Sequence, residues 1–170
     1  MNEEQYGIDI ENAHKKAIAL IPEDFFWSNF DECAPFGSDE GDTALAEYRD
    51  WRLENPSTPT IECLKWVIES IGEIQLEDYN EQLLDREKIK AGILDKDFDD
   101  DYYFYTLDVS VIATGFAQLV DEGTIAAENK PVIQVAIDRQ IIWAELIENR
   151  EHADRYIANL NVLSRVLKAA

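Results

Sequence analysis

The groups best suited to chemistry lie between Asp95 and Thr106, where aspartates alternate with other residues as in a calcium-binding loop. Asp95, Asp97 and Asp99 stand at positions 1, 3 and 5 of an EF-hand loop, after a predicted helix. The match then fails, because position 6 is Asp100 where the turn needs glycine. Position 12 is Thr106, where calcium needs both oxygens of a glutamate. We therefore interpret the segment as a solvated acidic loop and keep divalent-metal binding as the alternative.

Acidic side chains mixed with tyrosines also supply what a protein-binding surface needs, namely charge that attracts a basic partner and aromatic contact area. A second acidic group falls at the start of the helix predicted after Ser38. We predict that partner-binding residues come from these two groups, which comprise Asp97, Asp99, Asp100, Asp101, Tyr102, Tyr103, Asp39, Glu40 and Asp42.

Groups that would support catalysis are sparse. The histidines are His14 and His152, both expected on the surface, and the cysteines are Cys33 and Cys63, expected to be reduced thiols. Their spacing does not suit zinc, and the chain contains no GxSxG elbow, phosphate loop or GxGxxG turn. We expect a non-enzymatic protein with no catalytic residue, cofactor or metal ligand. A metal-dependent enzyme using paired carboxylates is the alternative.

The charge balance points to the class of partner. The 170 residues include 36 acidic and 15 basic side chains, for a net charge of −21. Residues 1–60 carry −10 of this and residues 61–108 carry −9, whereas residues 109–170 carry −2 and are rich in apolar side chains. Such a field repels nucleic acid and anionic lipid and attracts basic protein surfaces. We expect a basic protein partner and no direct contact with nucleic acid or membrane.

Targeting signals are not evident in the sequence. The first residues, Met1 to Gln5, form neither the basic start nor the apolar run of a signal peptide. The apolar stretches are interrupted by polar residues before reaching the roughly 18 residues that a membrane span requires. We expect a cytoplasmic protein.

The spacing of apolar residues predicts helices through most of the chain. The clearest stripe is formed by Ile61, Leu64, Ile68 and Ile71, and Gly72 is placed to end that helix. The predicted helices are residues 3–21, 39–54, 61–72, 77–94, 106–122 and 131–149, with a short segment at 23–27 and a last helix striped by Tyr156, Leu160, Leu163 and Leu167.

Two helices, 106–122 and 131–149, carry apolar residues on several faces. We therefore expect them near the centre of an all-α, single-domain, multi-helix bundle covering residues 1–170. Residues 103–111 also alternate with the two-residue period of a strand, and only residues 132–137 offer a partner strand. If both were strands the fold would be α+β. We favour a helix after Thr106, and hence the all-α fold, because no second strand of similar quality is available to pair with it.

The segment from Pro35 to Leu45, continuing to Tyr48 and Trp51, is the most motif-like part of the chain. It resembles acidic bacterial proteins of unassigned function, including immunity proteins that neutralise toxins, over about a tenth of the chain. The resemblance implies an inhibitor and carries no catalytic residue across. Gly41 in the first helical turn is unusual: either it allows close approach of another backbone, or it has no structural significance.

Three classes of function remain. The first is a binding inhibitor of the immunity type, whose acidic surface covers a basic enzyme. In another form of this first class, the acidic surface imitates the phosphates of DNA and titrates a DNA-binding protein. The second is a carboxylate-rich metal protein or metal-dependent enzyme. The third is an acidic adaptor, or a protein whose charge serves only solubility. We favour the first, because the acidic excess is concentrated in residues 1–108.

Overall fold

A computed structural model describes residues 7–94, 103–147 and 150–170. These residues contain no strand and form seven α-helices: α1 (Lys15–Leu20), α2 (Asp39–Glu54), α3 (Ile61–Gly72), α4 (Arg86–Leu94), α5 (Tyr103–Glu122), α6 (Lys130–Leu146) and α7 (Arg150–Ala169). The all-α fold is confirmed. The α+β alternative is wrong, because residues 103–111 lie in α5 and residues 132–137 lie in α6.

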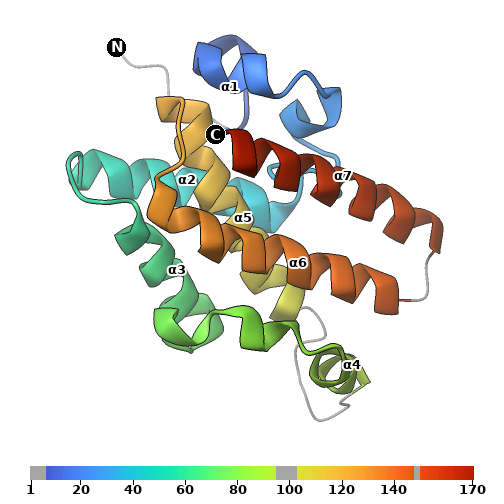
Figure 1. Ribbon diagram of the computed structural model, residues 1–170. Helices are drawn as coiled ribbons and strands as arrows, with labels where there is room; N and C mark the ends of the chain where they lie inside the picture. Colours follow the sequence, from blue (N-terminus) through green and yellow to red (C-terminus); the bar gives the residue numbers. More distant parts are fainter. Residues whose placement is uncertain (1–6, 95–102, 148–149) are drawn as a thin grey trace.

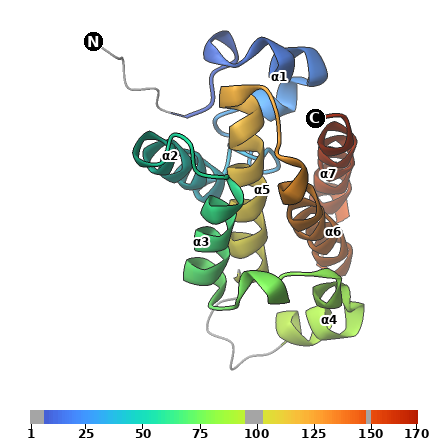
Figure 2. The ribbon, with the colours of Figure 1, turned by 60° about the vertical axis from the view of Figure 1, so that its left-hand side comes forward.

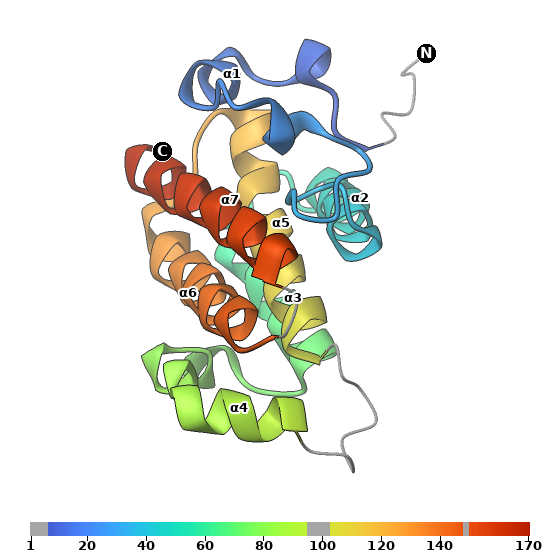
Figure 3. The same ribbon diagram turned by 90° about the vertical axis from the view of Figure 1, so that its right-hand side faces the viewer.

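The helices are arranged around α5, which runs through the middle of the molecule (Figure 1). Helices α2 and α3 lie on one side of it, and α6 and α7 lie on the other (Figure 2). Helix α1 and helix α4 lie at opposite ends (Figure 3). The described part of the chain is therefore a multi-helix bundle whose central helix contacts neighbours on several sides.

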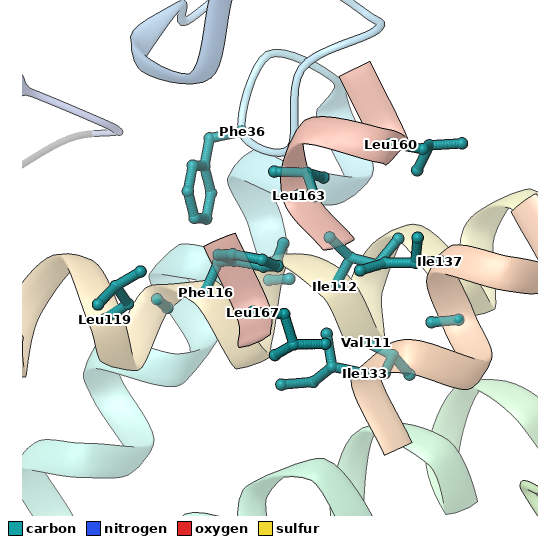
Figure 4. Close-up of a cluster of buried hydrophobic side chains, with 14 of the residues drawn as sticks. Phe36, Val111, Ile112, Phe116, Leu119, Ile133, Ile137, Leu160, Leu163 and Leu167 are labelled. Atoms are coloured by element: carbon teal, nitrogen blue, oxygen red, sulfur yellow. The ribbon is translucent and has the colours of Figure 1, made fainter. Parts of the chain in front are cut away.

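The core explains why the two-residue alternation near the start of α5 did not produce a strand. Every residue of α5 from Leu107 to Val120 is buried, so apolar residues are tolerated on all of its faces and their period carries little information. Side chains from α5, α6, α7 and the segment before α2 interdigitate there (Figure 4). The two broad apolar helices expected near the centre are α5 and α6.

Helix α5 is also the one helix among the described residues with the length and mean hydropathy that a membrane span would need. Most of that helix is buried inside the molecule. The core helix of a bundle has the same length and composition, and the packing of α5 against α2, α3 and α6 accounts for its apolar character.

The start of α2 follows the prediction closely. The Ser38 hydroxyl accepts a hydrogen bond from the Gly41 backbone N–H at 3.1 Å, and Asp39, Glu40 and Asp42 occupy the first turn. A β-carbon at Gly41 would lie 1.8 Å from the carbonyl oxygen of Pro35. Of the two alternatives for Gly41, the structure supports close approach of another backbone.

The long helix predicted over residues 3–21 is wrong in its described part, residues 7–21. The structure has a 3-10 turn at Ile10–Asn12 and the short α1 instead. The Asp9 carboxylate accepts hydrogen bonds from the Glu11 backbone N–H at 3.0 Å and from the Asn12 side chain at 2.6 Å. Such local side-chain bonds compete with helix hydrogen bonds and divide the segment.

The helix predicted over residues 77–94 is also divided. It becomes 3-10 turns at Leu76–Asp78 and Glu81–Leu84, followed by α4. Asn80 accepts a hydrogen bond from the backbone N–H two residues later at 2.8 Å, and Asp85 does the same at 3.0 Å. Each side chain caps the start of the helical segment that follows it, as asparagine and aspartate commonly do.

Candidate functional site

The residues predicted to bind a partner fall into two sets in the structure. Five of them lie outside the described residues: Asp97, Asp99, Asp100, Asp101 and Tyr102. The EF-hand positions Asp95, Asp97, Asp99 and Asp100 lie outside them as well. Elsewhere, in the residues that are described, no three histidine, cysteine, aspartate or glutamate side chains are grouped so as to hold a metal ion.

The second set lies within the described residues and comprises Tyr103, Asp39, Glu40 and Asp42. Tyr103 has a structural role at the start of α5. Its hydroxyl donates a hydrogen bond to the carbonyl oxygen of Gly72 at 2.7 Å, and its ring packs edge-on against Phe104. The contact joins the end of α3 to the start of α5. Burial raises the pKa of Tyr103, so the hydroxyl remains a donor at neutral pH.

Asp39 and Glu40 lie at the edge of a surface pocket, which we call the aromatic pocket. Its volume is about 590 Å³, within the roughly 300–1,000 Å³ typical of ligand sites. Asp42 is exposed in the same turn but does not line it. The lining residues are Asn29, Phe30, Glu32, Gly37, Ser38, Asp39, Glu40, Tyr105, Trp143, His152 and Tyr156.

Three helices bring aromatic rings together in this pocket. Tyr105 of α5 lies 5.7 Å from Trp143 of α6, measured between ring centroids, and 6.5 Å from Tyr156 of α7. Trp143 and Tyr156 meet edge-to-face at 6.5 Å, and His152 lies 6.4 Å from Tyr156. These separations fall within or near the range of favourable aromatic pairs. The rings are spread over about fifty residues of sequence, so no local motif indicated the pocket.

The ionisable groups of the pocket include three carboxylates at its rim and the imidazole of His152. Glu32, Asp39 and Glu40 line the pocket, and no lysine or arginine is among its described lining residues. Burial raises the pKa of Tyr105 to about 12, and the nearby charges of Glu40 and Glu32 add to the shift. The Tyr105 hydroxyl is therefore neutral at physiological pH, and the pocket combines aromatic walls with a negative rim.

A thiol and an imidazole meet beside the pocket. The Cys33 sulfur lies 3.8 Å from each ring nitrogen of His152, although the two residues are 119 positions apart. His14 and His152, both expected on the surface, are half-buried and so remain partly exposed. Burial raises the pKa of Cys33, which outweighs the lowering by Arg155. The thiol is thus protonated at neutral pH, unlike the thiolate of a nucleophilic cysteine.

Acidic residues continue from the pocket along α2. Five acidic residues recur at helical spacing and line the pocket or two further hollows along the helix: Asp39, Glu40, Glu47, Asp50 and Glu54. We call these five residues the α2 acidic face. The hollows have the indole of Trp66, 45% exposed, at their edge.

The arginines of α2 do not neutralise this face. The Arg49 Nε atom lies 3.0 Å from the Asp121 carboxylate, and the Arg52 Nη2 atom lies 2.8 Å from that of Glu122. Both arginines are thereby held against the end of α5. The ion pairs hold the cations of α2 on one side of the helix. The carboxylates of the α2 acidic face lie on the other side, where Glu40 is half-buried and the other four are exposed.

Comparisons of the chain with protein-family models, with curated proteins and with solved structures found no match.

Proposed function

We propose that this chain is a non-enzymatic protein-binding domain, an inhibitor of the immunity type that binds a basic target protein. The observation that carries the proposal is the continuity of the α2 acidic face with the aromatic pocket, since Asp39 and Glu40 belong to both. Carboxylates steer a basic partner into contact and set its orientation. Exposed aromatic side chains supply the buried contact area that holds it.

The arrangement of side chains favours binding over catalysis. The pocket contains a neutral Tyr105 hydroxyl, further aromatic rings, the imidazole of His152 and carboxylates, and the thiol beside it is protonated. These groups suit recognition of a cation. They also suit an inhibitor that covers the active site of a basic enzyme, where the natural substrate is anionic.

The test is capture of the partner from lysate of the source cell on the immobilised chain, with elution in steps of rising salt. A variant that removes four charges from the face, D39N/E40Q/E47Q/D50N, is compared with the wild type. The control variant removes four carboxylates at the α4 end instead, E77Q/D78N/E81Q/E87Q. Both variants are first shown to melt cooperatively, because Asp39 and Glu40 also stabilise the first turn of α2.

We expect one basic protein in near-equal amount, released by salt, recovered with the wild type and the control but reduced at least about tenfold with the face variant. Titration of that protein's own activity with the chain then tests inhibition. A DNA-binding protein in the eluate would identify the DNA-mimic form of the same function. Equal recovery with both variants, or no reproducible protein, contradicts the proposal.

A further inference from the structure

We infer that the aromatic pocket is a recognition site for an arginine side chain of the partner, with the guanidinium stacked on the rings and facing the rim carboxylates. The inference rests on the proposed function and names the chemical group that the same surface recognises. It is carried by the geometry of the rings, by the charge of the rim and by the way this chain holds its own arginines.

The rings provide faces that suit a planar cation. Tyr105 and Trp143 are tilted by 37° at 5.7 Å, whereas Trp143 and Tyr156 are nearly perpendicular at 89°. Trp143 and Tyr105 are half-buried, so part of each ring remains accessible from the pocket. A guanidinium over such a face is attracted by the electron-rich ring and buries its own weakly hydrated surface.

The rim supplies the complementary charge. Glu32 enters from the segment before α2, and Asp39 and Glu40 enter from its first turn. The guanidinium of arginine is planar, so its N–H donors can face a carboxylate while its plane lies on an aromatic ring. The ammonium of lysine is a strongly hydrated point charge and has no such plane. The combination of flat aromatic walls and open carboxylates therefore favours arginine over lysine.

The chain already holds two of its own arginines in the same way. The guanidinium carbon of Arg139 lies 4.8 Å from the ring centroid of Phe104 and its nitrogens contact Asp108. Arg52 lies 5.8 Å from the ring of Trp51 and its nitrogens contact Glu122. In both cases a ring and a carboxylate share one guanidinium. The aromatic pocket has both components, and none of its described lining residues is an arginine.

Phe30 at the pocket edge extends the site. It is 86% exposed, the most exposed of the large apolar side chains described. An apolar ring beside a charged pocket is suited to contact the aliphatic part of an arginine, or an apolar residue next to it in the partner. Phe30 therefore adds contact area to the arginine site.

The inference is tested by NMR titration of the wild-type chain with N-acetyl-arginine amide, following the four tryptophan indole N–H resonances. The neutral isostere N-acetyl-citrulline amide and the primary amine N-acetyl-lysine amide are titrated in parallel. Trp143 is assigned with the variant W143F, and the other indoles, of Trp27, Trp51 and Trp66, report binding elsewhere. The variant E40Q and the remote control E128Q are titrated with the same probes.

We expect a saturable shift of the Trp143 resonance by the arginine probe, with the citrulline and lysine probes at least about tenfold weaker. E40Q weakens arginine binding at least about threefold, and E128Q leaves it unchanged. Equal shifts with citrulline, equal affinity for lysine, or shifts confined to the other indoles would overturn the inference.

Binding of the captured partner to W143F separates this inference from the proposed function. If W143F binds the partner more weakly, and the wild-type chain shows the shift of the Trp143 resonance with the arginine probe, both the arginine site and the proposed function are supported. A partner that binds W143F as tightly as the wild type overturns the arginine site in that complex while the proposed function stands. An arginine response without any basic partner contradicts the proposed function and leaves the chemistry of the pocket supported.

Discussion

Asp108 of α5 and Arg139 of α6 form a two-pronged ion pair in the interior, with Arg139 Nη2 2.8 Å from Asp108 Oδ1 and Arg139 Nε 2.9 Å from Asp108 Oδ2. Their side chains are 0% and 3% exposed. The carboxylate also accepts hydrogen bonds from the Tyr79 hydroxyl at 2.6 Å and the Gln140 amide at 3.0 Å. The pair therefore connects α5, α6 and the segment before α4.

Breaking this ion pair on one side should strongly destabilise the protein. In R139M the Asp108 carboxylate stays buried without its cation, and we expect a loss of about 3–5 kcal/mol in the free energy of unfolding. Urea unfolding followed by circular dichroism measures it. The double variant D108N/R139M removes both charges and should cost less than the sum of the two single substitutions. A loss below about 1 kcal/mol in R139M, the value of an exposed pair, would show that burial adds nothing here.

The close approach at Gly41 reverses the usual effect of alanine. In an ordinary helix glycine to alanine stabilises by roughly 0.5–1 kcal/mol, but in G41A the new methyl group meets the Pro35 carbonyl oxygen. We expect a loss of about 1–3 kcal/mol, the cost of overpacking. Thermal unfolding of G41A is compared with that of T43A, an exposed change in the same turn that should stay within about 0.5 kcal/mol. An increase in stability for G41A would refute the steric explanation.

Glu122 should make stability depend on acid pH. Burial by itself would raise its pKa, but hydrogen bonds from Arg52 and Tyr48 outweigh burial and lower it. Because the folded-state pKa is depressed, this stabilisation is present above the unfolded value of about 4.3 and is lost as pH falls through the folded value. The Tm of the wild type should exceed that of E122Q at pH 7, and the gap should narrow below about pH 4. A gap independent of pH would contradict this linkage.

The two cysteines should react slowly in the folded protein. Burial raises the pKa of Cys33, and burial together with the charge of Glu47 raises that of Cys63 to about 12. The reactive thiolate is therefore scarce at pH 7. A disulfide-exchange reagent should label C33S and C63S slowly in buffer and rapidly in urea, with C33S, which retains Cys63, the slower variant. Rapid labelling of either in buffer would show a thiolate that burial does not suppress.

The charge excess predicts a response to salt. Screening of self-repulsion in a chain of net charge −21 should raise the Tm as sodium chloride increases. Calcium chloride at equal ionic strength should give the same Tm as the sodium salt. If calcium raised the Tm above the value in sodium chloride, and D97N/D99N abolished that extra increase, the result would support the divalent-metal alternative for the loop from Asp95 to Thr106.

Local signals predicted much of the fold. The helix predicted after Ser38 is α2, and the stripe from Ile61 predicted α3 with its end at Gly72. The helix predicted from residue 131 is α6, which begins one residue earlier, at Lys130. The errors came where Asp9, Asn80 or Asp85 side chains bind nearby backbone N–H groups and divide a helix. Their effect depends on which competing hydrogen bonds the tertiary structure makes available, so spacing alone did not reveal it.

The candidate site was predictable only in its local part. Asp39 and Glu40 were identified because they follow a helix cap in sequence. The pocket walls were not, since Tyr105, Trp143 and Tyr156 meet only when α5, α6 and α7 pack together. The sequence offered one related signal, the apolar residues on several faces of α5 and α6, which predicted only that these two helices lie near the centre of the bundle.

The central position of α5 has a consequence for how the chain is made. During synthesis α5 leaves the ribosome before α6 and α7. The residues from Leu107 to Val120 that later face those two helices therefore have no partner on that side until residues 130–169 have followed. The nascent chain thus passes through an interval in which an apolar helix is exposed beside a strongly acidic segment. Like-charge repulsion between the acidic segments of neighbouring nascent chains then opposes their association during that interval.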